Sequence, residues 1–314
     1  MTTTSTSPTA TQLAEDVAIV TAAADGPIGA DEVRPPTRRR AWSRLPLSAK
    51  FSLVLVGAVG IVAVLAPFLA PADPDVGITA DRLQGLGTDG YPLGTDGQGR
   101  DILSRLIWGA RPSLITGLIP VVVASSIGTV LGLVAGLGSR RTNSVVMRML
   151  DVFYAFPAIL LAIAIATILG SGSSNSIIAL SVVLIPPLAR MAESETSRLR
   201  GLDFMEAAEA SGATRLSIAW RHVMPNVAPA IVVYGTALIG LSIVYAAGLS
   251  FLGLGVQPPT AEWGLMVSDL RQYIFTDAGL ALVPAVAIVI VSVAFNVLGD
   301  GLRDVFDVRS ENRI

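Results

Sequence analysis

Cysteine is absent from the 314 residues, and lysine and histidine occur once each, as Lys50 and His222. Without cysteine the chain has no disulfide, no thiol nucleophile and no thiolate-ligated metal. The residues before Lys50 are leucine, serine and alanine, so no glycine-rich phosphate-binding loop with its lysine is present and the chain cannot be its own P-loop ATPase. His222 has no second ligand or base at a useful spacing, and we interpret it as a polar contact residue.

Charge is also scarce. Charged residues make up 15% of the chain against 52% hydrophobic residues, and the mean hydropathy is +0.64. These values predict an integral membrane protein, and the net charge of −2 gives no reason to expect a nucleic-acid partner. No charged residue falls well inside an apolar run, which argues against a proton or ion relay. Asp151 stands at the edge of a run, where we expect a solvated carboxylate.

Apolar runs of about the length of a membrane span occur six times. They lie near residues 51–70, 113–137, 152–169, 176–189, 227–252 and 280–298. A helix needs roughly 17 to 25 residues to cross the hydrocarbon, and only the fourth run is shorter. Because that run contains Pro186-Pro187, we expect a kinked span extended by a turn at its cytoplasmic end. The fold class predicted is therefore an all-α membrane protein with six transmembrane helices.

Basic residues lie mostly on one of the two sides that six spans define. Seventeen of the 22 share the side of the N-terminus: Arg34, Arg38, Arg39, Arg40, Arg44, Lys50, Arg140, Arg141, Arg148, Arg190, Arg198, Arg200, Arg215, Arg221, Arg303, Arg309 and Arg313. The other side has Arg82, Arg100, Arg105, Arg111 and Arg271. The positive-inside rule therefore predicts that both termini are cytoplasmic.

The expected organisation follows from these runs and charges. Residues 1–47 are predicted to be a disordered cytoplasmic tail, 48–72 the first transmembrane helix, and 73–111 an external loop with an amphipathic helix. Residues 112–302 are expected to form a core of five transmembrane helices that contains a cytoplasmic loop at 192–226, and residues 303–314 a cytoplasmic tail.

The polar segment 203–225 inside that cytoplasmic loop is predicted to form two short helices. We expect Asp203 to cap the first helix with Glu206 as its reciprocal partner, and Gly212 to end it in the left-handed conformation. Thr214 is expected to cap the second helix, which Pro225 stops.

The second helix of this segment carries an apolar stripe. Leu216, Trp220 and Val223 recur at spacings of four and three, beside a face with Arg215 and Arg221. This pattern predicts a surface that docks onto a partner. An ordinary amphipathic hairpin is the alternative.

Glycine-rich stretches outside the hairpin predict further contacts. Gly128, Gly132 and Gly136 form a small-residue stripe for close helix packing, or for a moving helix interface. A calcium loop at 96–101 is excluded, because an arginine stands where an oxygen ligand is needed. Residues 249–264 are expected to form either a passive turn, with a tryptophan at the membrane interface, or a gate that contacts a delivery protein.

The last span is followed by a second group of small and charged residues. Gly299, Gly301, Arg303 and Asp304 lie just after it, and helix termination explains them; a contact with an ATPase is the second choice.

The amino-acid sequence of the hairpin resembles a motif of a known family. Glu206-Ala207-Ala208, with Gly212 six residues after the Glu and Pro225 thirteen residues after the Gly, resembles the EAA loop of ABC importer permeases. In that family the loop presses into a cleft on the ATPase subunit. The resemblance implies that Glu206, Ala207, Ala208, Gly212, Leu216, Trp220, His222 and Pro225 form the ATPase-coupling loop.

Three other segments point to the same family. Tyr91–Leu114, Leu249–Gly264 and Phe295–Asp307 resemble the permeases of dipeptide, oligopeptide and nickel importers, in the subunit type that pairs with a second, different permease. With the hairpin, the resemblance covers roughly residues 45–309.

The resemblance implies the type I importer fold in a bacterial or archaeal cell membrane, and the partners of such a system. These are a homologous second permease, two ATPase domains in one chain or two, an extracytoplasmic solute-binding protein and membrane lipid. ATP and Mg would be used by the ATPase subunits, with no cofactor, metal or catalytic residue in this chain. Di- or oligopeptides are the implied substrate, with nickel complexes or another small solute as the alternative.

Other classes of membrane protein are alternatives to an ABC importer permease. An ion-coupled secondary transporter or channel predicts charged residues within the spans, which the sequence lacks. A membrane-embedded enzyme lacks a nucleophile-base pair or metal constellation at usable spacing, and a membrane scaffold is opposed by the four segments together.

Overall fold

The computed structural model describes residues 45–311, with side chains described through Phe306. The predicted N-terminal tail up to residue 44 and the end of the predicted C-terminal tail lie outside the described residues. The described chain is helical, with two isolated β-bridges, Thr88 to Tyr91 and Thr95 to Asp101, in the loop that precedes the longest helix.

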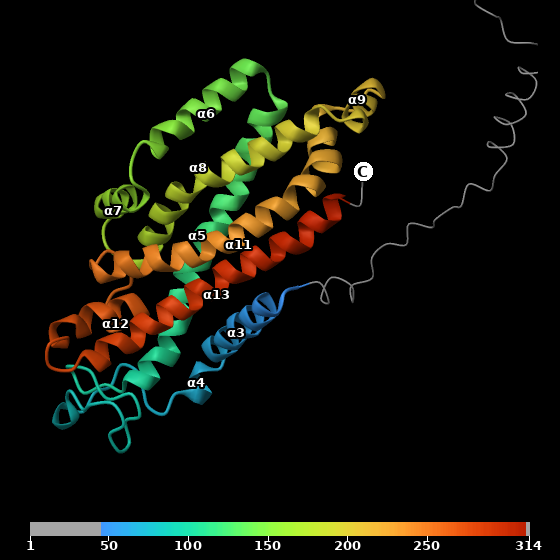
Figure 1. Ribbon diagram of the computed structural model, residues 1–314. Helices are drawn as coiled ribbons and strands as arrows, with labels where there is room; N and C mark the ends of the chain where they lie inside the picture. Colours follow the sequence, from blue (N-terminus) through green and yellow to red (C-terminus); the bar gives the residue numbers. More distant parts are fainter. Residues whose placement is uncertain (1–44, 312–314) are drawn as a thin grey trace, which may run out of the picture. The chain divides into compact units, whose positions relative to one another are not determined.

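The helices follow one another along the chain with short connections. In order they are α3 Leu47–Val64, α4 Ala66–Leu69, η1 Thr79–Asp81, α5 Ile102–Leu137, α6 Arg140–Tyr154, α7 Ala158–Leu169, α8 Ser173–Arg200, α9 Asp203–Ala210, α10 Arg215–Ser217, the π-helical η2 Ile218–Val223, α11 Met224–Phe251, α12 Trp263–Leu270, η3 Arg271–Tyr273 and α13 Ala278–Glu311. Helices α5, α8, α11 and α13 run side by side (Figure 1).

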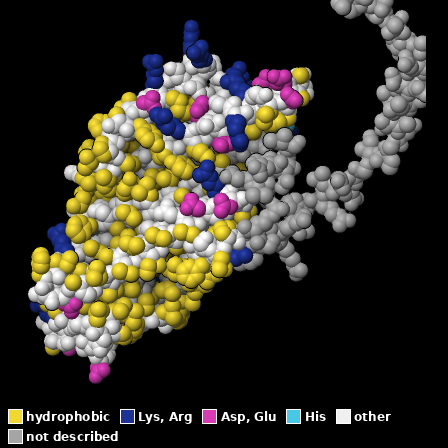
Figure 2. Space-filling view, viewed as in Figure 1, with side chains coloured by type: hydrophobic (Ala, Val, Ile, Leu, Met, Phe, Trp, Pro, Cys, Tyr) yellow, Lys and Arg dark blue, Asp and Glu magenta, His cyan; other side chains and the backbone are white. Residues whose placement is uncertain are grey.

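Five helices of the described chain are long and apolar enough to cross a membrane. They are α3, α5, α8, the continuous stretch from α10 to α11, and α13. A sixth span exists if the bent pair α6 and α7 is counted as one. The predicted six-span helical fold is confirmed in this form, and Figure 2 shows the hydrophobic side chains that cover the middle of the visible face.

The third predicted span differs from expectation. The run 152–169 is broken at Phe156-Pro157, and the axes of α6 and α7 differ by 86° across the break. Proline has no N–H and disfavours helical geometry in the residue before it, so the helix stops there. Helix α7 has 12 residues and is only about 18 Å long, which is too short to cross the hydrocarbon alone.

Two other predicted spans are parts of longer helices. Helix α5 begins at Ile102, so the amphipathic helix expected in the loop 73–111 and the second span form one helix of 36 residues. The Asp101 side chain caps it by accepting from the N–H groups of Leu103 and Ser104. The fourth run lies within the 28 residues of α8, which contains both Pro186 and Pro187 and extends well beyond the single turn that we expected.

The small-residue stripe on α5 packs against α8. A β-carbon at Gly132 would lie 2.4 Å from the Ala192 β-carbon, and one at Gly136 would lie 2.6 Å from the Thr196 side chain. The close-packing interpretation is therefore confirmed, because only glycine lets the two backbones approach this far.

The prediction that Gly299 and Gly301 mark a helix end is wrong. Helix α13 continues through them to Glu311. A β-carbon at Gly299 would lie 2.9 Å from the Ala237 backbone nitrogen on α11, and one at Gly301 would lie 2.1 Å from the Ala49 β-carbon on α3. Both glycines are therefore packing positions between helices.

The sequence suggested that Trp263 faces a membrane interface, but in the structure its side chain is buried. It is 3% exposed and belongs to a core cluster with Ile102, Ile243 and Leu280. Its indole N–H donates to the carbonyl of Leu106 over 2.9 Å. Helix α12 is thus packed onto α5 and α13, and it lies at the opposite end of the long helices from α9 (Figure 1).

A buried charge cluster fixes the loop before α5. Asp96 accepts from the Arg100 guanidinium over 2.6 Å and lies 3.6 Å from that of Arg105. Asp269 on α12 lies 3.6 Å from Arg100. Arg100 and Arg105 are 4% and 1% exposed. The excluded calcium loop is therefore a carboxylate-arginine cluster that joins the loop, α5 and α12.

Candidate functional site

The candidate site is the segment from α9 to the start of α11, here called the docking hairpin (residues 202–226). It lies at the end of the helices where, on the face shown in Figure 2, most of the visible Lys and Arg side chains gather. It is the end that the positive-inside rule predicts to be cytoplasmic.

The N-cap of the first hairpin helix is Leu202, one residue before the predicted N-cap Asp203. Leu202 is the N-cap and makes no side-chain cap bond, while Asp203 is already helical. An N-cap requires extended backbone, and Leu202, with ψ of 143°, supplies it. Asp203 and Glu206 instead lie in the first turn, where negative charge interacts favourably with the helix dipole.

The end of α9 confirms the role predicted for Gly212. Its φ is +78°, in the left-handed region. The Ala213 N–H donates to the Ala208 carbonyl over 3.2 Å and the Gly212 N–H to the Glu209 carbonyl over 3.0 Å, the two bonds of a Schellman motif. No atom lies within 4 Å of a β-carbon built at Gly212, so backbone geometry alone demands glycine here.

The second helix starts as predicted but does not stop at Pro225. Thr214 caps it by accepting from the Ser217 N–H over 3.3 Å. The helix then widens into a π-helical turn, in which the Met224 N–H donates to the Ala219 carbonyl, and continues as α11. Pro225 lies in the first turn of α11, directly after the π-helical turn. The hairpin is therefore joined to a membrane span without a break.

The expected apolar stripe divides between two faces. Val223 is fully buried, whereas Leu216 is 70% and Trp220 58% exposed. A π-helical turn has more residues per turn than an α-helix, so the spacing of four and three no longer keeps all three side chains on one face.

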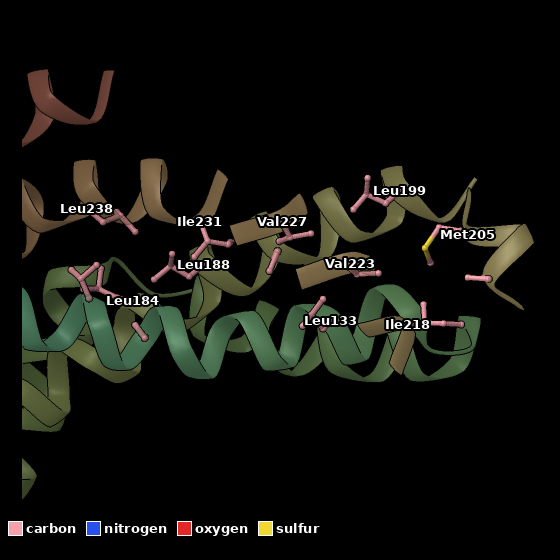
Figure 3. Packing of buried hydrophobic residues seen from close by; sticks show 14 residues of the cluster. Leu133, Leu184, Leu188, Leu199, Met205, Ile218, Val223, Val227, Ile231 and Leu238 are labelled. Atoms are coloured by element: carbon pink, nitrogen blue, oxygen red, sulfur yellow. The ribbon is translucent and has the colours of Figure 1, made fainter. Parts of the chain in front are cut away.

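The buried face of the hairpin anchors it to the bundle. Met205, Ala208, Ile218 and Val223 belong to one core cluster with residues of α5, α8 and α11, and Figure 3 shows Met205 and Ile218 beside α8 and α5. Helix α9 is thus packed against the ends of the spanning helices.

The outer face carries the other predicted residues. Glu206, Ala207 and Pro225 are exposed, Ala208 is buried, and His222 is half-buried with its carbonyl accepting from the Asn226 side chain over 2.6 Å. The sequence provides no metal partner for His222, and no group of three or more metal-ligating side chains was found among the described residues. The outer face therefore presents exposed apolar, acidic and basic side chains.

One set of hydrogen bonds between α8 and the end of α5 was not predicted from the sequence. The Arg200 guanidinium, at the end of α8, donates to the carbonyls of Gly136 and Gly138 over 3.2 and 2.9 Å. These carbonyls end α5 and have no partner within that helix. The sequence signal was the Gly138 that follows the apolar run, which leaves helix-end carbonyls for a cation to satisfy.

The fold and the site define a helical membrane protein whose hairpin continues without a break into a spanning helix. Residues 128–312 match the family model described as "Binding-protein-dependent transport system inner membrane component", and the chain belongs to this family. It is therefore a permease-type membrane component of an ABC importer, a transport component, as the sequence resemblance implied.

Related permeases align with most of the chain. The glutathione transport system permease protein GsiD of Pectobacterium atrosepticum is 42% identical over 257 residues, which cover 82% of this chain and 84% of the relative. GsiD of an Escherichia coli strain is 41% identical over 279 residues, which cover 88% of this chain and 92% of the relative.

A solved structure shows the same fold. A chain of the MetNI methionine ABC transporter in an inward-facing conformation matches with a TM-score of 0.54 and 22% identity, over 65% of this chain and 97% of that chain.

Proposed function

We propose that this chain is the pore-forming subunit of an ATP-driven importer of short peptides, and that the docking hairpin is where the ATPase subunit binds. The partners proposed are a second permease, two ATPase domains and an extracytoplasmic binding protein that delivers the solute. ATP and Mg would be bound by the ATPase subunits. The observation that carries the docking role is the pair of exposed apolar side chains, Leu216 and Trp220, on a helix whose other face is anchored in the core.

An exposed tryptophan and leucine on a polar hairpin favour a protein partner. Tryptophan is enriched among the residues that dominate binding energy at interfaces, and truncation of such a residue typically costs about 2 kcal/mol or more. Phe204 on α9 is also exposed, so the apolar contact surface spans both helices of the hairpin. Glu206 and Ala207 on its rim would fix the register of the partner.

Short peptides are proposed as substrate because the GsiD relatives are named for glutathione, a tripeptide. Di- and oligopeptides share the free carboxylate and ammonium groups of such a solute. Nickel complexes, the alternative from the sequence, are supported by none of the names of these relatives.

The docking role can be tested with the double variant Leu216→Ser and Trp220→Ser. The chain would be co-expressed with its neighbouring permease, ATPase and binding-protein genes, and the ATPase retained on the purified membrane complex would be measured. We expect retention to fall at least about tenfold, the effect of losing about 1.4 kcal/mol. The thermal midpoint of the complex-free chain should stay the same, because both side chains are exposed.

The matched control is Phe275→Ser, since Phe275 is 99% exposed in the loop before α13, at the other end of the helices. It should leave ATPase retention unchanged. Equal retention in the double variant and the wild type would show that the hairpin is not the docking site. Peptide uptake by this chain alone in liposomes without ATP would show instead that it is a secondary transporter.

A further inference from the structure

Helices α5 and α8 run parallel, so their C-terminal ends lie at the same end of the bundle, next to the docking hairpin. The contacts of the glycine stripe step along both helices in the same direction, from Gly128 with Ala189 to Gly136 with Thr196. The last turn of each helix leaves carbonyl groups without a partner inside the helix, and both ends carry partial negative charge. The place where the two ends meet therefore needs hydrogen-bond donors.

Arg200, the last residue of α8, supplies two of these bonds. One of its terminal nitrogens, Nη1, donates both to the Gly136 carbonyl and to the Gly138 carbonyl at the end of α5. The N-cap of α9 is Leu202, two residues further along the chain. A single side chain thus joins the end of α5 to the point where α8 enters the docking hairpin.

A second side chain binds the same turn of α5. The Asn143 amide, on α6, donates to the Ala135 carbonyl over 3.3 Å and to the Glu193 carboxylate on α8 over 2.7 Å. Two adjacent carbonyls of α5 are therefore held by side chains of two other helices. We call the group of Arg200, Asn143 and Glu193 the carbonyl clamp.

The apolar contacts between α5 and α8 are not directional. Leu133 and Leu199 belong to one apolar cluster with Met205 of α9, and the glycine stripe places glycine against alanine. Burial of apolar surface holds helices together without a preferred direction, and glycine and alanine have few side-chain atoms that resist sliding. Hydrogen bonds, in contrast, weaken steeply when distance or angle changes. The carbonyl clamp therefore fixes the end of α5 relative to the end of α8.

We propose that the carbonyl clamp couples the docking hairpin to α5, with Arg200 as its main positioning residue. When the ATPase subunit displaces the hairpin, the end of α8 moves with it, and the clamp makes α5 follow instead of sliding past. Without the clamp, α8 moves without α5, and less peptide is transported for each ATP hydrolysed. This assignment rests on the proposed function of the chain as the permease of an ATP-driven importer.

Arg111 provides a matched control, because it caps a helix end in the same way without any link to the hairpin. Its guanidinium, on α5, donates to the carbonyls of Ala63 and Val64 at the end of α3. That end of α3 leads into α4 and lies at the opposite end of the helices from α9 (Figure 1). Loss of Arg111 therefore removes an arginine cap but leaves the clamp intact.

The test is transport by the complete complex in proteoliposomes, with binding protein saturated with the tripeptide glutathione and peptide moved per ATP hydrolysed as the readout. Arg200→Met should lower this ratio at least about threefold, the size of effect expected when a coupling contact is lost. ATPase retention on the complex should stay within about twofold, because Arg200 lies outside the docking hairpin. Arg200→Lys should restore at least about half of the wild-type ratio, since one ammonium group can replace the single nitrogen that makes both bonds.

Two control variants should leave peptide per ATP unchanged. Arg111→Met removes the other arginine cap, and Arg198→Met removes a positive charge two residues before Arg200 whose partner, Glu195, lies on the same helix. A second test variant, Asn143→Leu, removes the other donor of the clamp and should lower the ratio at least about twofold. This variant decides the matter if Arg200→Met does not assemble.

The outcomes separate the two proposals. If the wild-type complex shows no ATP-dependent peptide uptake, the proposed function fails, and the coupling role fails with it. If the wild type transports and peptide per ATP is unchanged in the test variants, or falls equally in Arg111→Met, the clamp only caps α5, and the proposed function stands without it. A ratio that falls in Arg200→Met, recovers with lysine and is unchanged in Arg111→Met supports the coupling role.

Discussion

Gly132 on α5 and Ala192 on α8 lie so close together that a β-carbon added at Gly132 would be 2.4 Å from the Ala192 β-carbon and 2.6 Å from the Ala189 carbonyl oxygen. Such distances are far inside van der Waals contact. Helices α5 and α8 are therefore in backbone contact at this point, and any side chain at Gly132 must push them apart.

Gly132→Ala is expected to destabilise the chain by about 1 to 3 kcal/mol, the usual cost of overpacking a tight contact. The measurement is the thermal midpoint of the purified protein in detergent. Gly60→Ala on α3 is the control, because nothing lies within 4 Å of a β-carbon there, and it should leave the midpoint unchanged or raise it slightly. A midpoint for Gly132→Ala equal to that of the wild type would contradict the close contact.

A second prediction concerns the left-handed residue of the docking hairpin. Gly212→Ala places a β-carbon in a conformation that costs an ordinary residue about 1 to 2 kcal/mol, whereas Gly212→Asn should cost less because asparagine tolerates it. Since a β-carbon there meets no neighbour, the cost is local to the end of α9. We expect ATPase retention on the complex to fall in the order Gly, Asn, Ala, Val.

The order is the test of that prediction. Gly201→Ala is the control, because Gly201 has a negative φ of −91° and nothing within 4 Å of its β-carbon position. Asparagine and valine variants with equal retention would show that backbone conformation at residue 212 is not what positions the hairpin.

Much of the architecture could be predicted because membrane spans follow directly from hydropathy. The apolar runs, the glycine stripe on α5 and the caps at Gly212 and Thr214 each depend on neighbours in sequence, and each appears in the structure. The break at Phe156-Pro157 could have been read from the proline, but the hydrophobicity of the run concealed it.

The errors share a cause, which is tertiary packing. The π-helical turn at Ile218–Val223 moves Val223 into the core and lets the helix pass through Pro225. Trp263 is buried because α12 folds back onto α5 and α13. The pairing of Asp151 with Arg190 depends on α6 lying beside α8, and residues 39 positions apart in sequence carry no local signal of such a contact.

The buried carboxylate of Glu262 gives a prediction for pH. Glu262 is 1% exposed at the start of α12, and its carboxylate accepts from the Ser113 hydroxyl and from the N–H groups of Gly264 and Leu265. Burial raises the pKa of this carboxyl above its ordinary value of 4.5, against the lowering effect of these hydrogen bonds. The folded chain therefore holds this proton more tightly than the unfolded chain does.

The stability linked to Glu262 should be fully present below pH 4.5 and lost as the pH rises through the raised pKa of the folded state. The measurement is the difference in thermal midpoint between the wild type and Glu262→Gln across pH 4 to 8 in detergent. The wild type should lose stability relative to the variant as the pH rises. A difference that stays constant, or that changes in the opposite direction, would show that the hydrogen bonds outweigh burial.

The last prediction addresses the charge cluster before α5. Asp96 is the carboxylate closest to both Arg100 and Arg105, at 2.6 and 3.6 Å, and its side chain is only 5% exposed. Asp96→Asn removes the charge that compensates two buried guanidinium groups, and breaking a buried pair in this way typically costs about 3 to 5 kcal/mol. Asp269 and Asp75, which are 38% and 46% exposed, lie farther from the two arginines and would compensate only partly.

The control for Asp96→Asn is Glu195→Gln, which breaks the pair with Arg198 on α8. Because Arg198 is 67% exposed, that change should cost at most about 1 kcal/mol. Protease digestion of the purified protein is the more specific measurement, since the loop between α4 and α5 should become cleavable in Asp96→Asn while the helices stay intact. Equal cleavage and equal midpoints in the two variants would mean that Asp269 and Asp75 compensate the arginines, and that Asp96 is not the carboxylate that fixes the loop.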